Sequence, residues 1–188
     1  MSSLDFLNQR RSTPSRQLGL PGPSPDQLRT ILAAAMRVPD HGKLAPWRIL
    51  AIDGEARFAL GRFAARRALQ IDPAAPAAAI EKDHQRFAHA PLVLTVIAAP
   101  QPHPKVPEIE QILSAGSVCF ALLQAAQALG FGAQWLTGWP AYDDAVGKHL
   151  GLTDGESIVG FIHVGTAKDP TPERVRPAVD SRFSVWCP

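Results

Sequence analysis

Two capping boxes and a helical spacing of apolar residues organise the first forty positions. Ser2 with Asp5, and Ser24 with Gln27, each place a hydroxyl three residues ahead of a side chain that can bond back to the helix start. After the second box, apolar residues recur at i, i+3, i+4 and i+7, which predicts a helix with one buried face: Leu28, Ile31, Leu32 and Ala35. Dense proline and glycine before the second box end the first helix near Arg11.

The rest of the chain alternates strand-like and helix-like stretches. Apolar and β-branched runs predict strands at 47–52, 92–98, 131–137 and 157–164. Helical patterns follow at 55–70, in a short stretch ending at His89, at 108–129, and from Asp143 to Gly151. Such alternation predicts one domain over residues 1–188 of the α+β class (α/β-like), with a central mixed sheet flanked by helices.

The stretch 108–129 differs from the other predicted helices because it is apolar nearly all round. Such a helix is buried from every side only if something covers its outer face. In a chain of 188 residues, a second subunit is the simplest cover, so we expect a homodimer.

Composition narrows the class of protein. Apolar residues make up 46% of the chain and charged residues 19%, which is typical of a globular protein, and a net charge of +2 gives no reason to expect nucleic acid or a membrane surface. The N-terminal basic residues follow the apolar ones, the reverse of a secretory signal, and no apolar run looks long enough to span a bilayer. Cys119 lies in an apolar helix and Cys187 at the chain end, so we expect no disulfide and a cytoplasmic location.

Three short segments carry side chains suited to binding a ligand. Arg10, Arg11 and Ser12 end the first helix, where two guanidinium forks and a hydroxyl could hold a phosphate, or could simply cap the helix. Residues 37–47 (RVPDHGKLAPW) form a charged turn between a helix and a strand. There Arg37 could stabilise an anionic ring and His41 could bond a heterocycle edge, or the turn could be only polar surface.

The third segment is Gln134-Trp135-Leu136-Thr137-Gly138, at the end of a buried strand. Backbone N–H groups beyond the last strand pairing are free to face a ligand, and main-chain donors serve the polar edge of a flavin well. The alternative is a plain strand end with a core tryptophan.

Other site types find no support in the sequence. His84, His89 and His103 lack metal-ligand spacing, and no dinucleotide-binding glycine motif, P-loop or serine-nucleophile elbow occurs. The acidic residues are scattered, which argues against a carboxylate pair. We therefore expect no metal and no catalytic side chain, because a bound cofactor would carry the chemistry.

Taken together, the chain resembles the nitroreductase family, and within it the small bacterial NAD(P)H nitroreductases. The matching stretches, in the family's order, are RRS (10–12), MRVPDHGKLAPWRI (36–49), EQILSAGSVCFALLQAAQALGFGAQWLTG (110–138) and IVGFIHVGT (158–166). The broader family pattern P-S-x-x-N-x-Q-P-W is altered here: Asp40 and His41 replace the small polar pair, Lys43 the asparagine and Ala45 the glutamine. Acceptor preference therefore does not carry over.

The resemblance implies a homodimer with FMN between the subunits, NAD(P)H as co-substrate and a small-molecule acceptor. By position, it implies that the residues around FMN are Arg10, Arg11, Ser12, Arg37, His41, Trp135, Leu136 and Thr137, with Arg37 and His41 coming from the partner. Arg174 and Arg176 would supplement the phosphate site. An NAD(P) contact is implied for Ala125, Ala126, Gln127, Ala128, Leu129 and Gly130.

The implied activity is a ping-pong oxidoreductase that passes hydride from NAD(P)H through flavin N5 to a nitroaromatic, quinone or related acceptor. Within the family, enone reduction, dehalogenation and flavin breakdown are alternatives. Outside enzymology, the chain could bind flavin without turnover.

Overall fold

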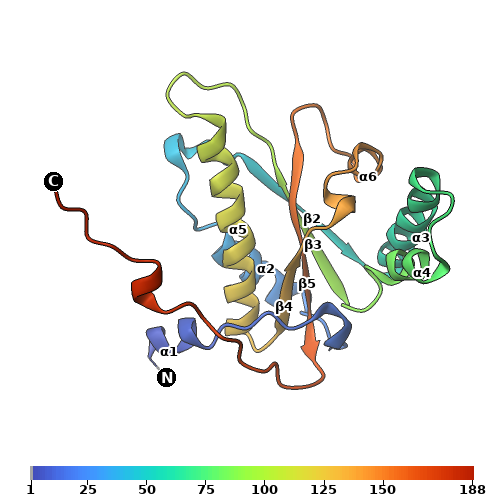
Figure 1. Cartoon of the computed structure of the whole chain (residues 1–188), viewed down its shortest axis with the longest axis horizontal. Coiled ribbons are helices and arrows are strands. Elements are labelled where there is room, and N and C mark those ends of the chain that lie inside the picture. The colour runs from blue at the N-terminus through green and yellow to red at the C-terminus, as the bar shows by residue number, and fades with distance from the viewer. Residues whose placement is uncertain (1) are drawn as a thin grey trace.

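The computed structural model describes residues 2–188 and shows a five-stranded sheet with helices packed on both faces (Figure 1). The strands are β1 (Leu18–Gly19), β2 (Trp47–Asp53), β3 (Leu92–Ala98), β4 (Gly132–Leu136) and β5 (Ser157–Ala167). The helices are α1 (Ser3–Asn8), α2 (Pro25–Ala35), α3 (Gly54–Ile71), α4 (Ala77–Gln85), α5 (Glu108–Ala128) and α6 (Asp144–His149). Short 3-10 turns cover Ser15–Gln17, His41–Lys43, Trp139–Ala141 and Val179–Ser181.

The structure confirms the helix caps and the buried strand that the sequence predicts. Ser2 and Ser24 each form the complete capping box, and Asp143 caps α6 by accepting from the backbone of Val146. Every residue of β3 is buried, as a run covered on both faces requires. The two-residue strand β1 was not anticipated, because it lies among the prolines and glycines and pairs with distant residues 166–167.

The expected α+β class with a helix-flanked sheet is confirmed, but all strand pairings are antiparallel rather than mixed. The connection between β2 and β3 explains the difference. Helices α3 and α4 run out and back, so the chain re-enters the sheet at the end where it left, with Asp53 opposite Leu92. A single crossover helix would have returned it for a parallel strand. The lone helix α5 does join two parallel strands, β3 and β4, but β5 lies between them.

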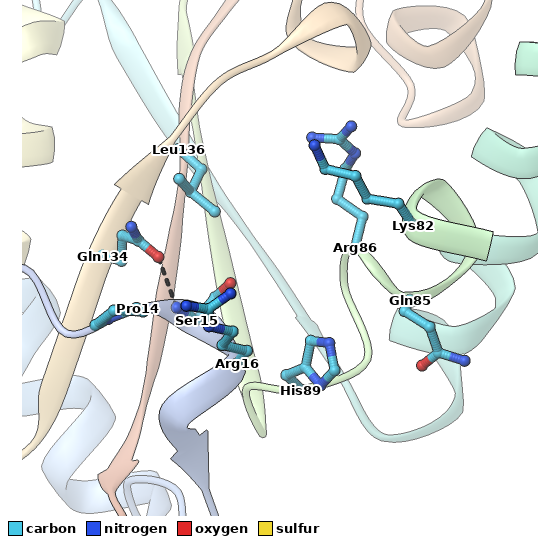
Figure 2. A pocket seen from close by; sticks show the side chains of 9 residues that line it. All are labelled: Pro14, Ser15, Arg16, Lys82, Gln85, Arg86, His89, Gln134 and Leu136. Carbon is cyan, nitrogen blue, oxygen red and sulfur yellow. Dashed lines mark hydrogen bonds between the residues drawn. The ribbon is translucent and has the colours of Figure 1, made fainter. Parts of the chain in front are cut away.

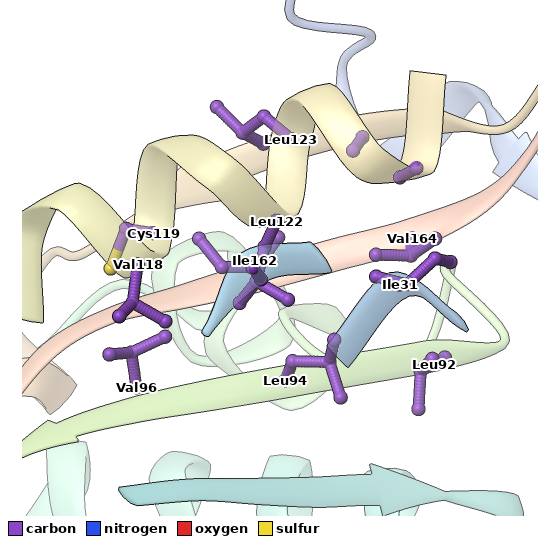
Figure 3. Packing of buried hydrophobic residues seen from close by; sticks show 13 residues of the cluster. Ile31, Leu92, Leu94, Val96, Val118, Cys119, Leu122, Leu123, Ile162 and Val164 are labelled. Atoms are coloured by element: carbon purple, nitrogen blue, oxygen red, sulfur yellow. The ribbon is translucent and has the colours of Figure 1, made fainter. Parts of the chain in front are cut away.

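The core lies on both faces of the sheet. Helices α2 and α5 cover one face, where Ile31, Val118 and Leu122 meet Leu94 and Ile162 (Figure 3). On the other face, α3 and the segment just after α4 cover a second cluster: Ile52, Leu60, Ala64, Phe87, Val93, Ala141, Ile158 and Phe161. The two clusters hold β3 and β5 rigidly in the middle, with β4 at the margin of the sheet (Figure 1).

Helix α5 corrects one expectation, because it is long and apolar enough to cross a membrane by length and composition. Its sheet-facing side is nevertheless buried, as in the core helix of a globular domain: Gln111, Ser114, Ala115, Val118, Cys119, Leu122, Leu123 and Ala126. The outer side exposes Ile109, Leu113 and Phe120. The C-terminal tail runs past α1 and away from the sheet (Figure 1) and carries the exposed Phe183 and Trp186.

Candidate functional site

The segment after α1 lies along the outer edge of β4. The backbone N–H of Thr13 donates to the carbonyl of Ala133 (3.1 Å), and that of Ser15 donates to the side-chain oxygen of Gln134 (2.6 Å). The approach is close, because a Cβ atom on Gly132 would lie 3.0 Å from Thr13 Oγ1. The first and third candidate segments, more than a hundred residues apart in sequence, are therefore neighbours.

Beyond Ala133, the outer edge of β4 offers free backbone groups. Strand β4 pairs with β5 on one side only. In an antiparallel strand, the N–H and C=O of one residue point to the same edge, and those of the next residue point to the opposite edge. Because the Ala133 carbonyl points outward, the groups of Trp135 and Thr137 do so as well, and no other part of residues 2–188 hydrogen-bonds to them. The sequence led us to expect unpaired donors after residue 134, and their contact with a ligand stays a prediction.

Positive charge gathers at the start of this edge. Arg10 is half-buried, and its desolvation together with the guanidinium groups of Arg176, Arg174 and Arg11 lowers its pKa. Arg10 donates to Ser12 Oγ (3.3 Å), and Arg176 donates to the Arg10 carbonyl (3.4 Å). Glu173 offsets part of this charge through ion pairs with Arg11 and with Arg176 (3.6 Å), and the repulsion that remains on Arg10 favours the binding of an anion.

Arg11 is used differently from Arg10. Its side chain forms an ion pair with Glu173 and donates to the carbonyls of Asn8 (2.7 Å) and Arg10 (2.9 Å). The guanidinium therefore ties the tail to the end of α1, and a phosphate contact by Arg11 stays a prediction.

A cavity of about 540 Å³, which we call the aromatic pocket, opens on the α5 side of β4. Its lining residues are Arg10, Ser12, Phe120, Leu123, Trp135, Thr137, Tyr142 and Val159. The Trp135 indole donates to the carbonyl of Val159 (3.2 Å) and lies on Gly160, where a Cβ atom would come 2.0 Å from Nε1. Only a glycine at position 160 leaves room for the ring to lie against β5.

A second cavity of about 450 Å³, the basic pocket, opens on the α4 side of the same strand (Figure 2). Its lining residues are Pro14, Ser15, Arg16, Lys82, Gln85, Arg86, His89, Gln134 and Leu136. Three of them are cations and none is an acid. Figure 2 shows Lys82, Arg86 and His89 across the cavity from Gln134 and Leu136. The sequence reasoning missed Arg16, Lys82 and Arg86, because no local pattern marks a scattered cation that only the fold brings to β4.

His163 lies on β5 opposite Gln134, inside the sheet. It is 1% exposed, its ring stacks on Phe87 at 6.0 Å, and both ring nitrogens lack a hydrogen-bond partner within residues 2–188. Burial, with smaller effects from Arg86 and His89, lowers its pKa to about 4. His163 is therefore neutral at neutral pH.

The second candidate segment lies at the other end of α5. His41 Nδ1 is 2.7 Å from Glu110 Oε2, in the first turn of that helix, and Arg37 is exposed just after α2. The aromatic pocket begins at Phe120, ten residues along α5, or about 15 Å at 1.5 Å per residue. Within one chain, then, the structure does not bring Arg37 and His41 to Arg10.

The turn containing His41 is nonetheless built rigidly. The Asp40 carboxylate accepts from the backbone of Leu44 (3.1 Å) and Ala45 (2.8 Å), and Lys43 and Ala45 both have positive φ. Non-glycine residues adopt that backbone conformation rarely, and often at binding sites.

Residues 125–130 form the C-terminal end of α5. The N–H of Phe131 bonds to the Ala126 carbonyl (3.0 Å), that of Gly130 bonds to the Gln127 carbonyl (2.9 Å), and Gly130 has a φ of 84°. This is a glycine-terminated helix end, where exposed carbonyls disfavour phosphate. The NAD(P) contact implied for this stretch stays a prediction with no support from the local geometry.

Comparison with known proteins identifies the family. The family model described as "Nitroreductase family" matches residues 7–166. A protein of Escherichia coli named "Putative NAD(P)H nitroreductase YdjA" is 37% identical, with 92% of this chain and 97% of the relative aligned. A protein of Haemophilus influenzae named "Putative NAD(P)H nitroreductase" is 31% identical over 98% of each chain.

Solved structures agree in fold. A nitroreductase-like protein from Bacillus cereus superposes with a TM-score of 0.83 at 21% identity, covering 98% of this chain and 96% of the other. A Desulfovibrio desulfuricans protein solved in complex with FMN and named as a nitroreductase gives 0.73 at 22% identity, covering 98% and 97%. On the family match and the two relatives, which run over most of its length, this chain belongs to the nitroreductase family.

Proposed function

We propose that this protein is an FMN-dependent oxidoreductase that uses NAD(P)H to reduce a small organic acceptor. The observation that carries the proposal is the guanidinium cluster around Arg10, placed at the start of a strand edge with free backbone groups. Bound FMN would supply the redox chemistry, and NAD(P)H and the acceptor would use the same site in turn. Family membership and the FMN complexes of related structures support this choice of cofactor.

The residues present fit the anionic end of FMN. Arg10, Arg174 and Arg176 repel one another, and a phosphate among them would relieve that repulsion through charge-assisted hydrogen bonds. Ser12, already bonded to Arg10, adds a hydroxyl for the phosphate or the ribityl chain.

The residues along β4 fit the ring end. The outward backbone groups of Trp135 and Thr137 offer donors and acceptors to the polar edge of a flavin, and Leu136 offers apolar contact. Lys82 and Arg86 in the basic pocket provide positive charge near that edge within the same chain. Such fixed charge favours an electron-rich ring.

A second copy of the chain would complete the site. Arg37 and His41 lie near the first turn of α5, too far from Arg10 to reach the same ligand, whereas a partner packed on the exposed side of that helix could bring its own copies there. The apolar residues left exposed on α5 and on the tail are consistent with such a homodimer.

The test is the retention of FMN. Arg10→Ala removes the central cation of the cluster, and losing one charge-assisted contact of roughly 1.5–3 kcal/mol should weaken FMN binding by about 10- to 100-fold. Arg62→Ala, which removes an exposed arginine from α3, is the matched control and should retain flavin through gel filtration. Equal retention in both variants would remove Arg10 from the site, and a colourless wild type that binds no added FMN would refute the proposal.

For the acceptor, the aromatic side chains beside Arg10 favour a planar aromatic molecule such as a nitroaromatic or a quinone. Anaerobic reduction with NADH or NADPH, followed by rapid mixing with a panel of acceptors, distinguishes these from enones and halogenated compounds. A flavin that neither nucleotide bleaches would indicate a flavin-binding protein without turnover.

A further inference from the structure

The guanidinium of Arg86 contacts a buried acid, Asp83, and also lines the basic pocket. Its Nε donates to Asp83 Oδ1 (3.0 Å), and its Nη2 donates to the same oxygen. The other carboxylate oxygen, Oδ2, accepts from the indole nitrogen of Trp139 (3.0 Å). Asp83 is 8% exposed, so both of its oxygens are committed inside the protein.

One nitrogen of Arg86 remains for the pocket. A Cβ atom built on Gly138, two residues beyond the end of β4, would lie 3.0 Å from Nη1. Gly138 also has a φ of 77°, so the chain turns at this point with no side chain between Nη1 and the strand end. Figure 2 shows the Arg86 guanidinium across the cavity from Leu136.

We propose that Asp83 is a positioning residue that fixes Arg86 with a single nitrogen facing the ligand and offsets part of its positive charge. The inference rests on the proposed function, because the ligand is the flavin whose ring end we assign to the edge of β4, beside the basic pocket. A lysine in place of Arg86 could not act in the same way. One ammonium group cannot both pair with Asp83 and face Gly138, whereas a guanidinium has separate edges for the two tasks.

The consequence concerns which form of the flavin binds more tightly. Positive charge beside the ring favours the reduced form, because reduction adds negative charge there. A buried carboxylate that is bonded to Arg86 diminishes this preference. Removing the acid while keeping a hydrogen-bond acceptor should therefore strengthen binding of reduced over oxidised FMN.

The experiment compares Asp83→Asn with Glu81→Gln. Both remove one negative charge from α4, but Glu81 is exposed and, in the part of the chain that the structure describes, contacts only Gln85 and His84 through its carboxylate. The midpoint potential of bound FMN is measured for each. D83N should raise the ratio of reduced to oxidised affinity at least tenfold, a shift of about +30 mV for a two-electron couple. E81Q should leave the ratio at the wild-type value.

Arg86→Lys tests the positioning of Arg86 with the carboxylate of Asp83 in place, and it replaces D83N as the test if D83N does not fold. It should lower the affinity ratio about tenfold. The inference is overturned if D83N matches E81Q, or if R86K matches the wild type, while the wild type binds FMN normally. A wild type that binds no FMN overturns the proposed function, and this inference with it.

Hydrogen exchange at the Arg86 side chain needs no flavin. The Nε–H of Arg86 should be protected relative to the exposed Arg62 in the wild type, and should lose that protection in Asp83→Ala, which removes the acceptor. Free exchange in the wild type would refute the positioning role whatever the cofactor does.

Discussion

Acid should weaken the fold through one buried side chain, His163. Its pKa is lowered from 6.5 to about 4 in the folded protein, chiefly by burial. As the pH falls below 6.5, the unfolded chain takes up a proton at this histidine, whereas the folded chain does so only near pH 4. The unfolded state therefore binds more protons across this window, and the free energy of unfolding decreases as the pH falls.

The size of the effect follows from the two pKa values. A difference of about 2.5 units at 1.36 kcal/mol per unit sets a ceiling of about 3 kcal/mol, reached below pH 4. At pH 5, the loss relative to pH 7.5 should be about 2 kcal/mol. Above pH 6.5, both states carry a neutral imidazole and the full contribution to stability is present.

Urea unfolding of the wild type and His163→Phe at pH 7.5 and pH 5 measures this loss. The variant keeps the aromatic stack on Phe87 and removes the titrating group, so it should lose about 2 kcal/mol less than the wild type between the two pH values. His149→Phe is the matched control, because His149 also stacks on a phenylalanine, Phe63, but is exposed. It should follow the wild type. Identical pH dependence in H163F and the wild type would refute the reasoning.

Two further predictions test the packing of Trp135 against β5 and the exposed side of α5. Gly160→Ala should displace the Trp135 indole, since the new Cβ would lie 2.0 Å from Nε1, and this should shift tryptophan fluorescence and cost about 1–3 kcal/mol of stability in urea unfolding. Leu113→Asp places a charge on the exposed side of α5, where Leu113 is 62% exposed, and should give monomers in sedimentation at concentrations where the wild type is a dimer. A monomeric wild type would contradict the homodimer expectation itself.

Local features of this fold could be predicted from sequence because their causes are local. A capping box is complete within four residues, and β3 is recognisable because each of its side chains is apolar or β-branched. Strand β1 has no such cause. Leu18 and Gly19 are extended because residues 166–167 pair with them, and nothing near position 18 announces that partner.

The candidate site, too, contains residues that could be predicted from local sequence and residues that could not. The sequence pointed to residues 10–12 and 134–138, since clustered arginines and a strand end are visible in one dimension. It did not point to Arg86, whose neighbours on α4 look like an ordinary charged helix. Arg86 lies near Gly138 because α3 and α4 leave the sheet after β2 and return before β3. Its pairing with the buried Asp83 is likewise visible only in the folded chain.

Helix α5 explains why the sequence could suggest ligand residues but not the subunit that delivers each. Its first turn holds His41 through Glu110, and its later turns form the wall of the aromatic pocket at Phe120 and Leu123. A rigid helix keeps those two regions apart in every copy of the chain. If Arg37 and His41 contact the flavin bound near Arg10, they must belong to another copy of the chain. That copy would pack on the exposed apolar side of α5, and the length of this helix then determines which of its residues can reach the flavin.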